Sequence, residues 1–233
     1  MPARRQPEVP LLDVAAIRAT RYGLIDISFQ VAAGTRHALI IPPVAGTGLL
    51  EIIAGLEHPD DGQVYLDGRA VTGRPMAKLT RESIGHLPAS PRWYAAPTVH
   101  GVLESAVRWQ VLTRRRPAAG LTGPQQVAEM LRRCGLAPYA HVRADRLPPG
   151  WWRMLDLAVI LLHRPRLILV DQATTGLADR ITLFRHVLDD LPDTVAVLAT
   201  VATVADAAGL ADQLTVINEG RVISHPPVGQ GGA

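Results

Sequence analysis

The segment His37-Ala38-Leu39-Ile40-Ile41-Pro42-Pro43-Val44-Ala45-Gly46-Thr47-Gly48-Leu49-Leu50-Glu51-Ile52-Ile53-Ala54-Gly55-Leu56 decides the fold of this chain. Its apolar start is typical of a buried strand, its centre is rich in proline and glycine, and residues 49–56 have apolar side chains at helical spacing. This order is that of a phosphate-binding loop, whose motif G-x-x-x-x-G-K-[ST] contains a lysine. No lysine follows Gly46, and Lys78 is the only lysine of the sequence. The segment therefore predicts the frame of a phosphate site without its cation.

Composition limits the class of protein. The 233 residues, 48% of them hydrophobic and 19% charged, suffice for one large domain or a domain with a subdomain. A net charge of +3 fits a surface that faces a membrane and does not require nucleic acid. Cys134 is the only cysteine, so an intrachain disulfide is excluded. Because the sequence lacks a bilayer-spanning apolar run and a secretory signal, we expect a cytoplasmic protein.

Strand and helix patterns alternate along the chain, which predicts an α/β fold with a largely parallel sheet. Residues 32–35 are expected to form a hairpin turn between the first two strands. We expect strands at 25–31, 37–41, 62–69, 84–88, 167–170 and 195–199, a hairpin of 214–217 and 221–223, and helices at 49–56, 98–112, 124–136 and 181–191. Within one domain over 1–233, residues 1–89 and 163–224 would form an α/β core with a β arm, about 90–162 a helical subdomain, and 225–233 a flexible tail.

These segments together resemble the nucleotide-binding subunit of an ATP-binding cassette (ABC) transporter, over about residues 22–223. The helix 49–56 is similar to the one that follows the phosphate-binding loop of that family, and Asp60-Asp61-Gly62-Gln63-Val64-Tyr65-Leu66-Asp67-Gly68 resembles its antiparallel arm. His163-Arg164-Pro165-Arg166-Leu167-Ile168-Leu169-Val170-Asp171 resembles the approach to its Walker B strand, and 175–177 and 211–222 continue in the same order. The resemblance implies a P-loop NTPase-like ABC ATPase core with an antiparallel β arm and a helical subdomain.

The resemblance also assigns the nucleotide-binding positions. Tyr22 falls where an aromatic residue stacks on adenine, Gly46 in the lysine position, and Thr47, followed by Gly48, in the position of the Mg²⁺-binding hydroxyl. Asp171 matches the Walker B aspartate, so Thr47 and Asp171 are the candidate Mg²⁺ ligands. A shifted alignment moves Thr47 into the lysine position, and both alignments lack a cation. A simple turn at 42–48, a core or surface role for Tyr22, and a helix-capping or hydrogen-bonding role for Asp171 stay open as alternatives.

The positions that perform catalysis in the family are all replaced. Ala89 takes the place of the glutamine of the Q-loop, and Leu147-Pro148-Pro149-Gly150-Trp151 takes the place of the signature Leu-Ser-Gly-Gly-Gln. Proline has no N–H to donate to a phosphate. Gln172 stands in the position of the catalytic glutamate and cannot accept a proton from water. Ala178 replaces the aspartate of the D-loop and Val201 the switch histidine, so no catalytic residue is assigned.

We therefore expect a degenerate nucleotide-binding subunit, peripheral to the inner face of the cell membrane, that binds ATP and Mg²⁺ weakly or not at all. Its partners would be a membrane permease, contacted by Trp93 and Tyr94, and a second, intact nucleotide-binding subunit; nucleic acid is not expected. Because family members pair head to tail, both composite ATP sites of such a pair would be damaged. Two alternatives stay open: an ATPase that hydrolyses ATP with atypical residues, and a soluble scaffold protein without a role in transport.

Overall fold

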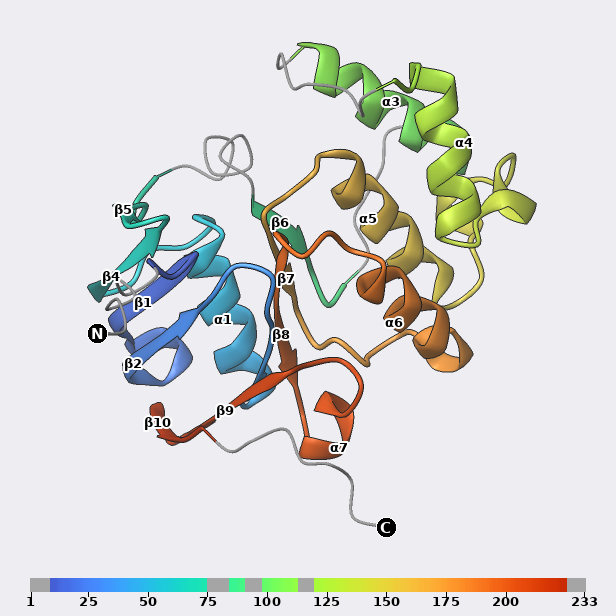
Figure 1. Ribbon diagram of the computed structural model, residues 1–233. Helices are drawn as coiled ribbons and strands as arrows, with labels where there is room; N and C mark the ends of the chain where they lie inside the picture. Colours follow the sequence, from blue (N-terminus) through green and yellow to red (C-terminus); the bar gives the residue numbers. More distant parts are fainter. Residues whose placement is uncertain (1–8, 75–83, 91–97, 113–119, 226–233) are drawn as a thin grey trace, which may run out of the picture.

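The computed structural model describes residues 9–74, 84–90, 98–112 and 120–225. Their strands form one ten-stranded sheet in the order β5-β4-β1-β2-β10-β9-β3-β8-β7-β6 (Figure 1). The strand bounds are β1 Leu12–Ala19, β2 Leu24–Val31, β3 Arg36–Ile40, β4 Asp61–Leu66, β5 Arg69–Ala70, β6 Ile84–Leu87, β7 Leu167–Val170, β8 Ala196–Val201, β9 Gln213–Asn218 and β10 Arg221–Ser224.

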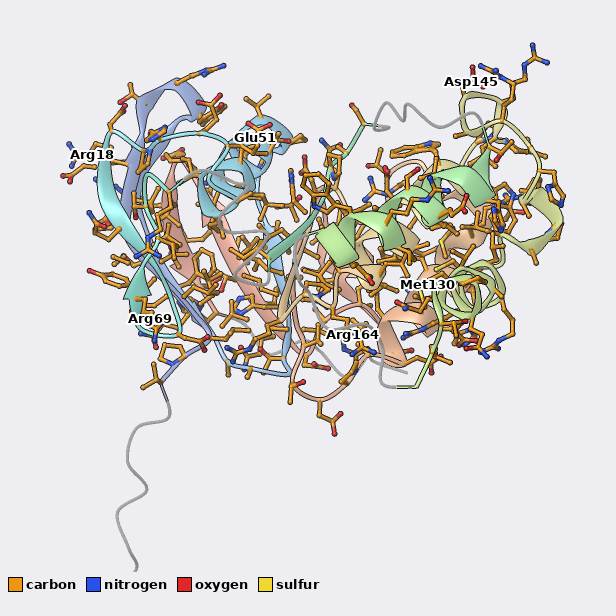
Figure 2. All side chains as sticks on the ribbon, turned by 90° about the horizontal axis from the view of Figure 1, so that it is seen from above. Arg18, Glu51, Arg69, Met130, Asp145 and Arg164 are labelled. Carbon is orange, nitrogen blue, oxygen red and sulfur yellow. The ribbon has the colours of Figure 1, made fainter. Side chains whose placement is uncertain are left out.

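The sheet has an antiparallel part and a parallel part. Strand β1 pairs antiparallel with both β2 and β4, and β5 continues this arm. Strands β9, β3, β8, β7 and β6 are parallel neighbours, and β10 joins the two parts by pairing antiparallel with β9 and parallel with β2. Figure 2 shows the arm, with Arg18 and Arg69, on the side of the molecule away from Met130 and the helical region.

The parallel strands are buried on both faces, because helices cover each side of them. In β7, Leu167 and Leu169 belong to the apolar cluster around α1 (Pro43–Ile53) and the antiparallel arm. Ile168 and Val170 belong to the cluster on the opposite face, which includes α5 (Trp151–Leu162) and α6 (Ile181–Asp189). This period of two is that of any strand, and burial of both faces explains the uninterrupted apolar run Leu-Ile-Leu-Val.

The helices α3 (Val99–Leu112) and α4 (Gly123–Arg133) lie beyond α5, away from the sheet (Figure 1). A capping box between Thr122 and Gln125, followed by Pro124 in the first turn, marks the start of α4. The remaining elements are short: η1 Thr20–Tyr22, η2 Ala137–Tyr139, η3 Ala144–Arg146, η4 Ala178–Arg180 and α7 Val204–Ala207. Among the described residues no helix has the length and apolarity to span a membrane.

Three sequence-based expectations about local structure were wrong or incomplete. Residues 32–35 do turn, with the N–H of Thr35 bonded to Ala32 O, but β2 and β3 are not hairpin partners, because β10 and β9 lie between them. The helix expected at 49–56 begins at Pro43, so most of the expected loop is helical. Strand β1 was not expected, because a positive φ of 53° at Ala16 and shifts in register interrupt its alternation.

Candidate functional site

The carboxyl end of β3 leads almost directly into α1. Only Ile41 and Pro42 separate the strand, which ends at Ile40, from the helix, which begins at Pro43. An α-helix leaves its first four N–H groups free to bind an anion. Here the N-cap residue Pro42 and the first helical residue Pro43 have no N–H, and the N–H of Gly46 is bonded to Pro42 O at 2.9 Å. Pro42 and Pro43 therefore remove two of the four N–H groups that the start of this helix would otherwise offer to a phosphate.

The two glycines of this segment are close to neighbouring side chains. A Cβ on Gly46 would lie 2.9 Å from Ile41 Cγ2 and 3.1 Å from Thr200 Cγ2, which leaves no room for a side chain. A Cβ on Gly48 would lie 2.2 Å from Tyr22 Cγ, so the Tyr22 ring packs directly on the backbone of α1. The hydroxyl of Tyr22 donates to Glu51 Oε2 at 3.4 Å. The guanidinium of Arg21 lies over the Tyr22 ring, with its Cζ 5.1 Å from the ring centroid.

Asp171, directly after β7, is the centre of a buried cluster of hydroxyls. Thr47 Oγ1 donates to Asp171 Oδ2 at 2.7 Å, and Thr200 Oγ1 donates to Asp171 Oδ1 at 3.0 Å. The Thr200 hydroxyl also accepts the N–H of Gln172 at 2.7 Å, while Gln172 itself has a positive φ of 46°. With 1% of its surface exposed, Asp171 has both carboxylate oxygens bound by the protein.

Arg153 of α5 is a fully buried cation that contacts the backbone of Asp171. Its Nη2 donates to Asp171 O at 2.9 Å and its Nη1 donates to Pro88 O at 3.1 Å. Burial lowers the pKa of Arg153 to about 10, so the guanidinium stays charged near neutral pH. Because two backbone carbonyls accept its hydrogen bonds, Arg153 ties α5 to the ends of β6 and β7.

The residues at the signature position pack within their own chain. Gly150, with φ 89°, precedes α5, and a Cβ there would lie 2.9 Å from Leu177 O. The N–H of Trp151 is bonded to Pro148 O at 3.1 Å, so it too is occupied. The Trp151 ring packs against Tyr139, with centroids 4.8 Å apart, and under Arg180, whose Cζ is 4.9 Å from the ring. Leu147, Pro148 and Pro149 therefore offer little hydrogen bonding to an anion.

The structure brings together some of the residues singled out in the sequence. Thr47 is hydrogen-bonded to Asp171, and the Thr200 hydroxyl links Asp171 to the backbone N–H of Gln172. Val201, the last residue of β8, is 97% buried, Ala89 follows Pro88 after β6, and Ala178 begins η4. Trp93 and Tyr94 lie outside the described residues.

Sequence reasoning did not single out Thr200 or Arg153 as parts of the site. Thr200 lies in the buried strand β8, and its hydroxyl in an otherwise apolar strand was the only feature of the sequence that indicated a role. Arg153 was signalled by its position three residues before Asp156 on α5, which places two charged side chains on the buried face of that helix. Among the described residues no group of three or more histidine, cysteine or acidic side chains could hold a metal.

A family model described as ABC transporter matches residues 24–175. The chain belongs to the ABC transporter family. It is 32% identical over 201 residues to an uncharacterized ABC transporter ATP-binding protein, YxlF, of Bacillus subtilis (strain 168), covering 84% of this chain and 63% of that protein. It is 30% identical over 201 residues to the Fe(3+) ions import ATP-binding protein FbpC 1 of Rhodococcus jostii (strain RHA1), covering 84% and 55%. This ABC transporter family chain thus spans only part of the length of these relatives.

Solved ATP-binding cassettes have the same fold as this ABC family member. One determined as a dimer in a post-hydrolysis state with ADP and Pi superposes with a TM-score of 0.78 at 19% identity, over 93% of this chain and 98% of that one. A nucleotide-free cassette superposes with a TM-score of 0.75 at 20% identity, over 94% and 91%. The family and the α/β ABC ATPase fold expected from the sequence are therefore confirmed.

Proposed function

We propose that this chain is a nucleotide-binding-type subunit of an ABC transporter in which the ATP site has become a structural element. It would act on the cytoplasmic face of a membrane, as a structural or regulatory partner of a permease and of a second, active ATPase subunit. One observation carries the proposal: only Ile41 and Pro42 separate β3 from α1, and both the N-cap residue Pro42 and the first helical residue Pro43 are prolines. A helix that begins there has no long loop before it, and two of its four N-terminal positions have no N–H to donate to a triphosphate.

The cluster around Asp171 supports the same proposal. A Walker B aspartate would bind Mg²⁺ through a carboxylate oxygen, in competition with hydrogen bonds to the same oxygen. In this chain both oxygens accept hydroxyl hydrogen bonds, from Thr47 and Thr200. Magnesium would have to displace Thr47 and then find its remaining ligands on a nucleotide that this chain holds poorly. Mg²⁺ would therefore compete with two hydroxyls for Asp171, which weakens the fit of these residues to Mg-ATP.

The position of Gln172 completes the argument. Its side-chain amide has no basic site, so it cannot remove a proton from an attacking water. Val201 replaces the histidine of the family with a buried hydrocarbon. If this chain pairs head to tail with an intact subunit, one composite site would contain the altered α1 start and the other would contain Pro148 and Pro149. Neither site would be complete, which favours holding and positioning of partners over hydrolysis.

Calorimetric titration of the chain with ATP, with and without Mg²⁺, tests the loss of nucleotide binding. An intact ATP-binding cassette in the same buffer serves as the positive control. We expect no saturable binding up to millimolar ATP, and micromolar affinity would refute the proposal. The variant Gln172→Glu restores the carboxylate of the catalytic position alone. We expect its ATP turnover to stay at background, because a general base is useless without a bound phosphate, and turnover above background would favour an atypical ATPase.

The proposed partners call for a separate experiment. The tagged chain, expressed in its own host, should co-purify from detergent extracts with a polytopic membrane protein and with a cassette subunit that has a complete lysine-containing loop. The matched sample is the same tag on an unrelated soluble protein. Recovery of the chain entirely in the soluble fraction, without a membrane protein, would instead support a scaffold without a role in transport.

A further inference from the structure

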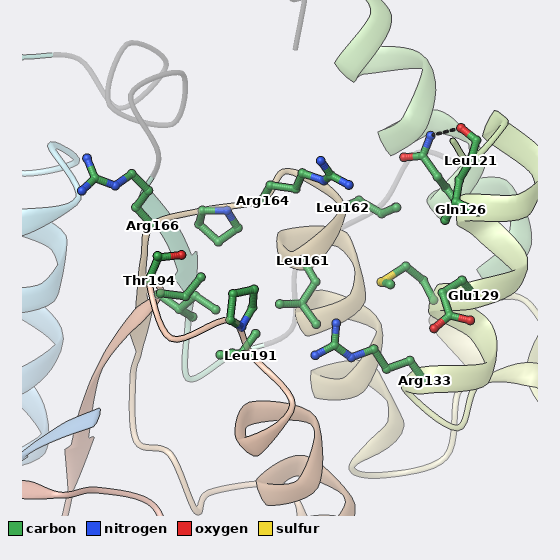
Figure 3. Close-up of a pocket in the computed structure, with 15 residues that line it drawn as sticks. Leu121, Gln126, Glu129, Arg133, Leu161, Leu162, Arg164, Arg166, Leu191 and Thr194 are labelled. Carbon is green, nitrogen blue, oxygen red and sulfur yellow. Dashed lines mark hydrogen bonds between the residues drawn. The ribbon is translucent and has the colours of Figure 1, made fainter. Parts of the chain in front are cut away.

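A cavity lies at the amino ends of the parallel strands β7 and β8, whereas Asp171 follows the carboxyl end of β7. The cavity has a volume of about 540 Å³ and is bounded by α4, the last turn of α5, and the loops that precede β7 and β8 (Figure 3). Ligand cavities in proteins commonly measure about 300–1,000 Å³. None of the positions that bind nucleotide in the family lines it, so a role for this cavity is independent of the proposed function.

The inner wall of the cavity is aliphatic. It consists of side chains from the ends of α5 and β7 and from the loop before β8, namely Leu161, Leu162, Pro165, Ile168, Leu191, Pro192 and Val195. Met130 of α4 closes the wall on the side of the helical region. Such a lining gains free energy when an apolar chain displaces water from it, at about 25 cal/mol per Å².

Cationic groups surround this apolar wall. Arg133 of α4 points into the cavity (Figure 3), and its Nη2 donates to Asp190 O at 2.9 Å and to Val187 O at 3.3 Å. These bonds fix the guanidinium and leave its other N–H groups for a ligand. Glu129, which also lines the cavity, forms an ion pair with Arg132 at 2.7 Å, so its charge is already balanced. Arg166 is paired with Asp67.

Arg164 is held at the mouth of the cavity by an unfavourable backbone conformation. It follows the C-cap residue His163 of α5 and has φ 51°, in the left-handed region where glycine is preferred after a helix. Its N–H is bonded to Leu161 O at 3.0 Å, so the turn is a regular helix end. No ion pair of Arg164 occurs within the described part of the chain. Unfavourable backbone conformations are often found at ligand sites, where the side chain has a role.

We propose that this cavity binds a small amphipathic anion, a carboxylate on an aliphatic chain of medium length. The chain packs on Leu161 and Leu191, and the carboxylate lies at the entrance, where Arg164 donates to it, while Arg133 adds positive charge to the wall. Charge complementarity favours an anion, because Arg133 and Arg164 line the cavity and the one carboxylate there, Glu129, is already paired with Arg132. The depth of the apolar wall selects a chain over a compact anion such as acetate.

Calorimetric titration of the full chain with decanoate, below its micelle concentration, tests the site. Acetate has the charge without the chain, and decyltrimethylammonium has the chain with the opposite charge, so neither should bind. Arg164→Gly should reduce the affinity for decanoate about tenfold or more, since a hydrogen bond to a charged group is lost. Glycine adopts the positive φ of position 164 without strain, so this variant is expected to fold. Arg108→Gln, which removes an exposed, paired arginine on α3, is the matched control and should bind as the wild type does.

Glu129→Gln gives a result of the opposite sign, because removing a negative charge from the wall should raise the affinity for decanoate. Equal affinity in the wild type, Arg164→Gly and Arg133→Gln would overturn the proposal, as would binding of decyltrimethylammonium with the same affinity as decanoate. Two sources share this chemistry: a free fatty acid, whose carboxylate is ionised, and the anionic surface of a bilayer, whose acyl chains are esterified and whose charge lies on phosphate. Flotation with phosphatidylglycerol vesicles separates these sources: decanoate should compete with any vesicle binding, and vesicle binding without decanoate binding would overturn the cavity assignment.

Discussion

Replacing Thr47 with valine removes the hydroxyl that donates to Asp171 and keeps the shape of the side chain. The bond is 2.7 Å long, and its acceptor is a carboxylate with 1% of its surface exposed. Hydrogen bonds to charged groups stabilise proteins by about 1.5–3 kcal/mol, and threonine and valine have similar helix propensities. We therefore expect Thr47→Val to lower the free energy of unfolding by about 2 kcal/mol. With a urea m-value of about 2–3 kcal/mol/M, the midpoint would fall by roughly 0.7–1 M.

Urea unfolding followed by tryptophan fluorescence measures this change. The matched control is Thr182→Val, at an exposed position of α6, which should change the stability by less than about 0.5 kcal/mol. A double-mutant cycle with Asp171→Asn isolates the interaction between the two side chains, and we expect a coupling energy of about 1–2 kcal/mol. Millimolar Mg²⁺ should leave the midpoint of the wild type unchanged.

Two results would refute this reasoning. A coupling energy near zero would mean that the Thr47 hydroxyl does not form a stabilising hydrogen bond with Asp171. Stabilisation of the wild type by Mg²⁺, absent in Asp171→Asn, would mean that the carboxylate is a metal ligand. A metal at one hundred times its dissociation constant stabilises the folded state by about 2.7 kcal/mol, which this assay resolves.

Three further predictions concern other parts of the molecule. Gly48→Ala should cost about 1–3 kcal/mol in urea unfolding, because its Cβ would meet the Tyr22 ring, and the cost should shrink in a Tyr22→Ala background. Burial lowers the pKa of His37 to about 4, so in acid the unfolded chain binds a proton that the folded chain excludes. The free energy of unfolding should therefore fall by roughly 2–3 kcal/mol between pH 6.5 and pH 4. The fall should be smaller in His37→Gln. Cys134, whose pKa burial raises to about 12, should react with a thiol reagent only after unfolding.

The parallel core could be predicted from the sequence because burial on both faces leaves a direct trace. The run Leu-Ile-Leu-Val at 167–170 has no polar residue, and β7 occupies those residues. The hairpin of β9 and β10 was equally clear, since Asn218, Glu219 and Gly220 supply the turn, with positive φ at the last two. Helix α4 was predicted from its apolar spacing, and the structure ends it at Arg133, before the expected 136.

The start of α1 could not be predicted, because local composition and tertiary packing favour different outcomes. Two prolines and two glycines within 42–48 are typical of a loop. Proline is nevertheless tolerated in the first helical turn, and packing of Gly46 and Gly48 on neighbouring side chains offsets their low helix propensity. The bonds of Thr200 and Arg153 depend on which strands are neighbours, and the sequence contains that information only through the whole fold.

The short connection between β3 and α1 bears on whether this chain could regain the missing chemistry by mutation. A lysine at Gly46 would meet Ile41 and Thr200, and the segment would still have only Ile41 and Pro42 between strand and helix. Recovery would require an insertion that unwinds the first turn, replacement of both prolines, and release of Thr47 from Asp171, with no benefit until all had occurred. Each intermediate would lose stability before it gained a ligand. Under the proposed function, single substitutions at the start of α1 would therefore not restore an ATP site.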